Sequence, residues 1–143
     1  MRTYYDLIPS QQNIYLLVKF SFHKEIVQIP ASFSMEKEYK AAPGDTINLN
    51  IMPKQAKKFL IYSSDNSTYV AVKENNLEAE AIGTAVITAS LRMYPEVTQT
   101  CTIKVLFEDV QNEKDYYYAP VYWAFENDTT TGTSKRTFSP KNN

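Results

Sequence analysis

Residues 46–52 read TINLNIM and alternate between polar and apolar side chains along their whole length. Successive side chains of a β-strand point to opposite faces, so this pattern predicts a strand with one buried face. The apolar side chains on that face are Ile47, Leu49 and Ile51. Residues 42–45 (APGD) predict a turn before the strand, because proline fixes φ and glycine permits a positive φ. Pro53 ends the strand.

Similar short runs, separated by turn residues, fill the chain from residue 24 to residue 106. The other runs that predict strands are residues 24–29, 58–62, 69–74, 84–91 and 98–106. Asn75 and Asn76 predict a tight turn, because asparagine tolerates the left-handed region. This region shows no helical periodicity of any length. About seven strands with turns every 8–12 residues are typical of an antiparallel β-sandwich, so we expect a mainly β fold.

The N-terminal extension, residues 1–23, contains the most apolar run of the chain, IYLLVKFSF at residues 14–22. The run alternates, Lys19 interrupts it, and it is shorter than the roughly 20 residues that cross a bilayer. It therefore predicts a half-buried strand rather than a signal peptide or a membrane span. Without a signal peptide, the sequence leaves open the compartment and whether the chain is a piece of a longer product.

The segment from residue 107 to residue 143 changes character. After the acidic stretch FEDVQNEKD, apolar side chains at i, i+3, i+4 and i+7 predict a short amphipathic helix. This stripe consists of Tyr118, Val121, Tyr122 and Phe125. Pro120 fits the first turn of the helix, Asp115 is a candidate N-cap, and we expect the helix to end near Asn127. The stripe needs an apolar partner, and the sequence leaves open whether this chain supplies one.

The composition excludes several classes of function. The net charge is −1, so no basic surface indicates nucleic-acid binding. One cysteine and one histidine exclude a disulfide framework and disfavour a Cys/His metal site, and three glycines leave no glycine-rich phosphate loop. The alternation of residues 98–106 turns Cys101 inward, which predicts a buried free thiol. We expect no cofactor and no metal.

Carboxylates are the side chains that most resemble a catalytic set. Glu108 with Asp109, and Glu126 with Asp128, could form the pair that a glycosidase uses, but such an enzyme needs two carboxylates across a cleft. These pairs flank loops, so we expect no catalytic residues and no enzyme. Other polar candidates are expected to be solvated surface side chains; they are His23, Lys54, Lys57 and Lys58. Contact with phosphate or an acidic glycan is the alternative for the three lysines.

Several motifs keep their order and spacing over about 80 residues. They are GDT at residues 44–46, Pro53, SSD at residues 63–65, GTAVITA at residues 83–89 and CTIKV at residues 101–105. On these motifs, the stretch from Ile26 to Val105 resembles the group 2 bacterial immunoglobulin-like domain. Ile61 stands where that family often has tryptophan, and Asn76 replaces its usual turn glycine. The resemblance implies that residues 24–106 form an Ig-like β-sandwich.

A second set of motifs follows. They are FEDV at residues 107–110, the tyrosines at residues 117–118, VYWAFEN at residues 121–127, TGTS at residues 131–134 and FSP at residues 138–140. On these motifs, residues 107–143 resemble the beginning of an S-layer homology module. Asp128 and Thr129 replace the Gly-Ile of that family, and its later Thr-Arg-Ala-Glu-type motif is absent from this chain. The resemblance implies a cell-surface, cell-wall or secreted location and cell-wall polysaccharide or a surface glycan as partner.

The candidate carbohydrate-binding residues are Asp109, Tyr117, Trp123 and Gly132. Tyr117 and Trp123 fall off the helical stripe, and aromatic faces with a polar edge suit sugar rings. Asp109 and Gly132 belong to the motifs of the second resemblance, and Asp109 has the alternative role of accepting hydrogen bonds from nearby backbone.

Together these observations predict a non-catalytic structural or adhesion module of a bacterial cell-surface protein, joined to an incomplete cell-wall-anchoring segment. A carbohydrate-binding module, which would bind cell-wall polysaccharide, is one alternative. A phage or virion surface protein is another.

Overall fold

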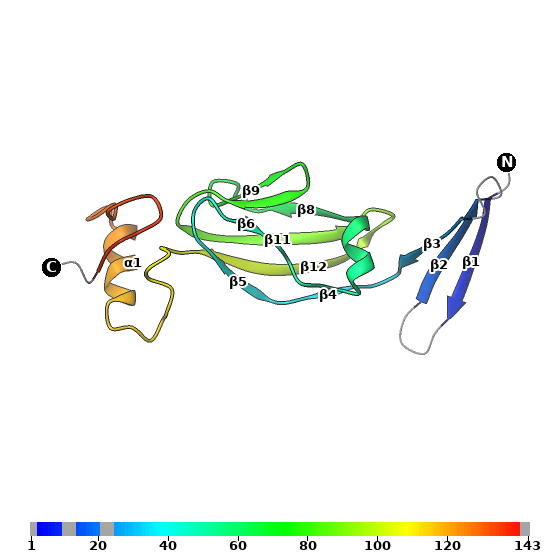
Figure 1. Cartoon of the computed structure of the whole chain (residues 1–143), viewed down its shortest axis with the longest axis horizontal. Helices are drawn as coiled ribbons and strands as arrows, with labels where there is room; N and C mark the ends of the chain where they lie inside the picture. Colours follow the sequence, from blue (N-terminus) through cyan, green and yellow to red (C-terminus); the bar gives the residue numbers. More distant parts are fainter. Residues whose placement is uncertain (1–2, 10–13, 21–24, 141–143) are drawn as a thin grey trace. The chain divides into compact units, whose positions relative to one another are not determined.

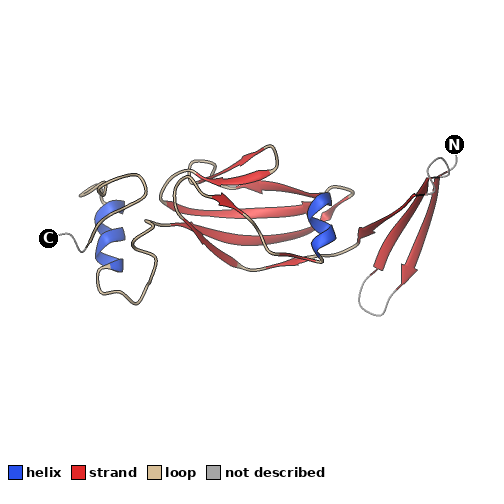
Figure 2. Ribbon diagram, viewed as in Figure 1, coloured by secondary structure: helices blue, strands red, loops and turns tan. Residues whose placement is uncertain are grey.

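The computed structural model describes residues 3–9, 14–20 and 25–140, and the side chains from residue 28 onward. The described residues are mainly β, with a short α-helix near the C-terminus (Figures 1 and 2). The chain divides into two compact units, each built from separate stretches of sequence. The first unit contains Met1–Glu36, Leu49–Tyr62 and Thr88–Thr100. The second contains Lys37–Asn48, Ser63–Ile87 and Cys101–Asn143.

The first unit begins with a three-stranded antiparallel sheet. Its strands are β1 (Thr3–Pro9), β2 (Ile14–Phe20) and β3 (Glu25–Pro30). We expected one strand before residue 24, and the described residues there contain two, paired with each other from Thr3↔Phe20 to Pro9↔Ile14. The strand expected at residues 24–29 is confirmed as β3, which pairs with β2. A two-stranded ladder of β4 (Ser34–Met35) and β7 (Ile51–Met52) belongs to the same unit.

Two further sheets complete the described strands. The order of the three-stranded sheet is β6 (Thr46–Ile47), β10 (Asn76–Ala79) and β9 (Val70–Lys73). The order of the four-stranded sheet is β5 (Glu38–Ala41), β12 (Tyr94–Val105), β11 (Gly83–Leu91) and β8 (Leu60–Ser64). Strand β5 runs parallel to β12, with Thr102 opposite Glu38. The expectation of a purely antiparallel arrangement is therefore wrong for this pair, and the four-stranded sheet is mixed.

The alternating stretch at residues 46–52 keeps its predicted burial but is not one strand. Leu49 and Ile51 are buried, Ile47 is half-buried, and the polar side chains between them are exposed. The ladder breaks after Ile47, because β6 pairs with β10 whereas β7 pairs with β4. Side-chain periodicity reports which face is buried, and a chain that changes hydrogen-bonding partner midway keeps that periodicity.

Two other local predictions need correction. Residues 58–62 are not a single strand, because a 3₁₀ helix, η1 (Lys54–Phe59), precedes β8. Ala56 on that helix is fully buried, so the short helix contributes to the core. The tight turn between β9 and β10 lies one residue earlier than expected: Glu74 and Asn75 have the positive φ values, 49° and 63°. Asn76 already pairs with Lys73 in the ladder.

The long strands β11 and β12 contribute many of the buried side chains. Alternate side chains of both strands are buried to 2% exposure or less: Ala85, Ile87, Ala89, Leu91, Cys101, Ile103 and Val105. Burying a valine, leucine or isoleucine side chain stabilises a fold by about 1.5–3 kcal/mol. The inward orientation predicted for Cys101 is confirmed, and burial raises the pKa of its thiol to about 11.

Helix α1 (Tyr118–Glu126) confirms the helix predicted from the aromatic stripe, with Pro120 in its first turn. The prediction that Asp115 caps the helix is wrong, because no side chain caps its N-terminus. The Asp115 carboxylate instead accepts hydrogen bonds from the Tyr117 hydroxyl and the Asn112 amide. In place of a cap, the backbone N–H of Tyr118 donates to the Asp115 carbonyl at 3.0 Å.

The helix ends with a paired backbone motif. The N–H of Asp128 donates to the carbonyl of Phe125 at 3.1 Å, and the N–H of Thr129 donates to the carbonyl of Ala124 at 2.9 Å. This is the Schellman arrangement, which places the residue after the C-cap in the left-handed region. Asp128 has φ 54° and occupies that position. The motif pattern that residues 107–143 resemble has glycine here.

Candidate functional site

An aromatic cluster fixes the C-terminal segment within the second unit. Its buried members are Ile82, Phe107, Val110 and Val121, and the partly buried side chains packed against them are Tyr117, Tyr118, Tyr122, Phe125 and Phe138. The Phe107 ring meets the Phe125 ring edge-on at a centroid distance of 5.4 Å and the Phe138 ring at 5.5 Å. The chain therefore supplies the apolar partner that the helical stripe needs.

The Tyr122 hydroxyl closes this cluster with two backbone hydrogen bonds. It donates to the Val110 carbonyl at 2.6 Å and accepts from the Phe107 N–H at 2.9 Å. Burial is the main cause that raises the pKa of this phenol, so the hydroxyl keeps its proton in the physiological range. One side chain thus satisfies two backbone groups of the loop that precedes the helix.

Arg136 connects the C-terminal segment to the turn between β5 and β6 through polar contacts. Its guanidinium donates to Asp45 Oδ1 at 3.0 Å, to Glu108 Oε2 at 3.3 Å and to the Pro43 carbonyl. Asp45 belongs to the turn between β5 and β6, where Gly44 has φ 90°. A Cβ at Gly44 would lie 3.2 Å from the Arg136 guanidinium, so glycine also allows this close approach.

Two of the four candidate sugar-binding residues, Asp109 and Gly132, contact other parts of the C-terminal segment. The Asp109 carboxylate accepts hydrogen bonds from the backbone N–H groups of Phe138, at 2.9 Å, and Ser139, at 2.6 Å. This is the alternative role expected for Asp109. Gly132 has φ 80°, and a Cβ there would lie 2.9 Å from the Thr137 carbonyl and 3.0 Å from the Phe107 ring. Gly132 is therefore part of a tight packing arrangement.

The other two candidates differ in exposure. Trp123 is 63% exposed, as expected for a residue off the helical stripe. Tyr117 is partly buried against the aromatic cluster, donates its hydroxyl to Asp115 at 2.9 Å, and contacts Tyr116 at a ring distance of 5.1 Å. Tyr117 is therefore less accessible than its position off the stripe indicated.

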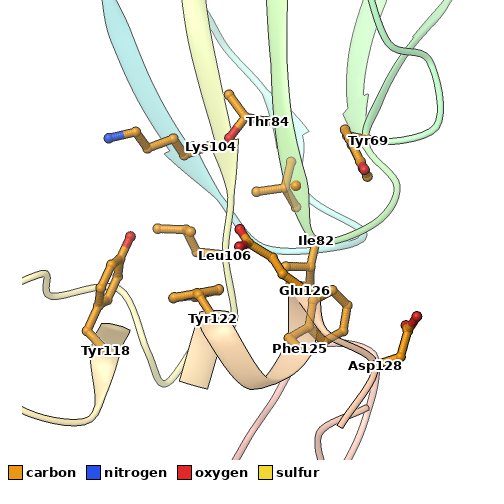
Figure 3. Close-up of a pocket in the computed structure, with 12 residues that line it drawn as sticks. Tyr69, Ile82, Thr84, Lys104, Leu106, Tyr118, Tyr122, Phe125, Glu126 and Asp128 are labelled. Atoms are coloured by element: carbon orange, nitrogen blue, oxygen red, sulfur yellow. The ribbon is translucent and has the colours of Figure 1, made fainter. Parts of the chain in front are cut away.

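A pocket of about 660 Å³ lies where strands β11 and β12 approach helix α1. The residues that line it are Tyr69, Ile82, Gly83, Thr84, Lys104, Val105, Leu106, Tyr118, Tyr122, Phe125, Glu126 and Asp128. In Figure 3, the hydroxyl of Tyr118 and the carboxylate of Glu126 point from the helix towards the strand ends, and Tyr69 lies on the opposite side of the pocket. The volume is within the range of ordinary small-ligand sites, about 300–1,000 Å³.

The pocket is lined by aromatic rings and by more acidic than basic side chains. Glu126 and Asp128 are the two carboxylates among the residues that line it, and within the described residues neither makes a hydrogen bond or an ion pair with a side chain. Lys104 is its cation, and its ammonium lies 3.1 Å from Glu38 and 3.4 Å from Glu113. The hydrogen bond to Glu38 is the main cause that raises the pKa of Lys104.

Sequence reasoning considered Glu126 and Asp128 only as a catalytic pair and missed the pocket. None of its lining residues stood out as a binding site, because Tyr69, Lys104 and Glu126 come from three distant stretches of sequence. The only available signal was the excess of tyrosine, eleven residues in this chain.

Four polar candidates from the sequence remain. His23 lies outside the described residues, and Lys54, Lys57 and Lys58 occupy exposed positions on η1. No group of three or more potential metal-ligating side chains occurs in the part of the chain that the structure describes. Among the described residues, no helix has both the length and the apolar character needed to span a membrane.

No protein-family model matches the chain. A search of curated proteins likewise returned no match.

Proposed function

We propose that the chain is a non-catalytic structural or adhesion module of a bacterial cell-surface protein, in which residues 24–106 form an Ig-like β-sandwich. The mainly β fold and the two inward-facing rows of aliphatic side chains on β11 and β12 support this proposal. A packed sheet with a continuous core resists deformation, which is what a spacer needs.

The observation that carries the proposal is the attachment of the C-terminal segment. Phe107, Val110 and Val121 pack with Ile82, which directly precedes β11. Arg136 reaches Asp45, 91 residues away in sequence. The segment after β12 is therefore part of a folded unit and not a loose tail.

Hydrogen exchange of the whole chain tests this proposal. We expect the amides of residues 107–138 that are hydrogen-bonded in the structure to exchange together with those of β12, because one core protects both. Fast exchange of the whole C-terminal segment alongside a protected β12 would contradict the structural role. A parallel pull-down with cell-wall polysaccharide should show no retention if the module acts only as a spacer.

A second candidate function is carbohydrate binding. The pocket beside helix α1 favours it, because tyrosine rings offer apolar faces to the C–H side of a sugar and hydroxyls to its polar edge. Retention of the chain on immobilised oligosaccharides, lost in a Tyr118→Ala variant, would support this function over a purely structural one.

A further inference from the structure

The pocket between helix α1 and the ends of β11 and β12 has the chemistry of a site for a positively charged sugar. From its aromatic walls and its excess of carboxylates, we infer that it binds a hexosamine with a free amino group, in the form of a short glucosamine-type oligosaccharide. This inference rests on the second candidate function above and names its ligand class.

The first observation is the aromatic wall. Tyr69 and Tyr118 both line the pocket, and Figure 3 shows them on opposite sides of it. The Tyr69 ring lies directly on the backbone of Gly83, since a Cβ there would be 2.5 Å from two of its ring atoms. Gly83 has φ 152°, so the absence of a side chain permits both this backbone conformation and the close packing of the Tyr69 ring. The ring is held in place before a ligand arrives, which lowers the entropic cost of binding.

The second observation is the charge balance. The Glu126 carboxylate points into the pocket and Asp128 lies at its edge in Figure 3, whereas the single ammonium of Lys104 is already paired with Glu38 and Glu113. The Glu113 carboxylate has a second cationic partner, because it also lies 3.3 Å from the ammonium of Lys40. The uncommitted charge at the pocket is therefore negative, which attracts a cationic ligand and disfavours an anionic polysaccharide.

The third observation is the size of the site. A volume of about 660 Å³ greatly exceeds what a lone ammonium group needs, and it suits a ligand with a ring as well as a charge. A pyranose bearing an amine meets both requirements, because its C–H face stacks on tyrosine while its ammonium pairs with a carboxylate. The Thr84 hydroxyl on the pocket wall can hydrogen-bond to the ring hydroxyls.

The test is calorimetric titration of the full chain with three probes. A glucosamine oligosaccharide carries both ring and charge, an N-acetylglucosamine oligosaccharide of equal length carries the ring alone, and a short lysine peptide carries the charge alone. We expect the first to bind at least about tenfold more tightly than either of the others, the range that one charged hydrogen bond supplies. Salt at about 1 M, where the screening length is about 3 Å, should weaken it.

Variants locate the site. Glu126→Gln combined with Asp128→Asn should weaken glucosamine binding by about tenfold or more, and Asp128→Asn keeps a side chain that tolerates the left-handed region. Tyr118→Phe keeps the ring and should retain most of the affinity, whereas Tyr118→Ala should lose it. Glu96→Gln removes an exposed carboxylate on β12 outside the pocket and should change nothing. Circular dichroism confirms that each variant is folded.

Each outcome decides between the inference and the function on which it rests. Equal or tighter binding of the N-acetylated oligosaccharide overturns the choice of a cationic sugar but leaves carbohydrate binding standing. Equal binding of the lysine peptide overturns the need for a sugar ring. No binding of either oligosaccharide overturns both the inference and the second candidate function, and leaves the structural role.

Discussion

Arg136 Nη2 lies 3.0 Å from Oδ1 of Asp45, and Oδ2 of the same carboxylate accepts the backbone N–H of Ala42 at 2.9 Å. A single carboxylate therefore closes the turn between β5 and β6 and holds the C-terminal segment to it. The Asp45 backbone takes part as well, since its carbonyl accepts the Ala79 N–H at 2.9 Å. The turn that the sequence predicted is thus also the anchoring point for a distant part of the chain.

Replacing Asp45 with asparagine should make the stability of the folded chain less sensitive to a fall in pH. The Ala42 N–H and then Arg136 hold the pKa of Asp45 below its ordinary value of 3.8, although partial burial opposes this shift. A group with a lowered folded-state pKa contributes stability above its unfolded pKa and loses it as the pH falls through the folded one. We expect chemical denaturation below about pH 4 to show a smaller loss for Asp45→Asn than for the unchanged chain. Because Asp45 is solvent-accessible, the difference should be small and shrink with salt.

The Glu96→Gln variant is the control for this acid titration, because no described contact of its carboxylate is lost. An acid-induced loss for Asp45→Asn equal to that of the unchanged chain would show that the carboxylate contributes nothing to the turn.

Removing the hydroxyl of Tyr122 should destabilise the second unit by about 1–3 kcal/mol. The change to phenylalanine keeps the ring and leaves the Phe107 N–H and the Val110 carbonyl without their hydrogen-bond partner. Urea denaturation at neutral pH measures the loss. Tyr116→Phe is the matched control, since Tyr116 is 85% exposed, and it should leave the midpoint unchanged. Equal midpoints for both variants would contradict the role given to Tyr122.

Replacing Asp128 with glycine should stabilise the chain by up to about 1 kcal/mol. Asp128 has φ 54° at the end of helix α1, and a left-handed residue other than glycine carries a steric cost of about 1–2 kcal/mol. Part of this gain is offset by the greater freedom of glycine in the unfolded chain. Thermal denaturation of Asp128→Gly and Asp128→Ala gives the comparison. The glycine variant should melt highest and the alanine variant lowest, and the reverse order would rule out a strained helix end.

The thiol of Cys101 should react slowly with a thiol reagent while the chain is folded. Burial raises its pKa to about 11, and the thiolate is the reactive form. At neutral pH we expect little labelling of the native chain and rapid, complete labelling in concentrated urea. Fast labelling under native conditions would contradict the inward orientation of this side chain on β12.

Sequence periodicity predicted side-chain burial better than it predicted hydrogen-bonding partners. The alternation of residues 46–52 located Leu49 and Ile51 in the core, yet it contained no sign that β6 and β7 join different sheets. Likewise, the run at residues 24–29 predicted a strand but not its pairing with β2. The alternation of buried and exposed side chains is a property of a single strand, whereas a hydrogen-bonded ladder requires two strands that are often distant in sequence.

The same division holds for the candidate site. Helical spacing selected Tyr118, Val121, Tyr122 and Phe125, and it also predicted that Trp123 would be exposed. It placed Tyr117 among the accessible residues, because a stripe predicts only the helix face and not the loop side chains that fold against it. Asp109 received two alternative roles from sequence, and the contacts with Phe138 and Ser139 support the structural one.

By itself, the sequence determined what short-range chemistry controls: the β-rich character, the turn at Pro43 and Gly44, the helix around Pro120 and the inward side of Cys101. Only the tertiary structure decided which distant groups meet. It brought Arg136 to Asp45, and it assembled the pocket from Tyr69, Lys104 and Glu126. The physical reason is that local preferences act within a few neighbouring residues, whereas contacts across tens of residues depend on how whole strands pack.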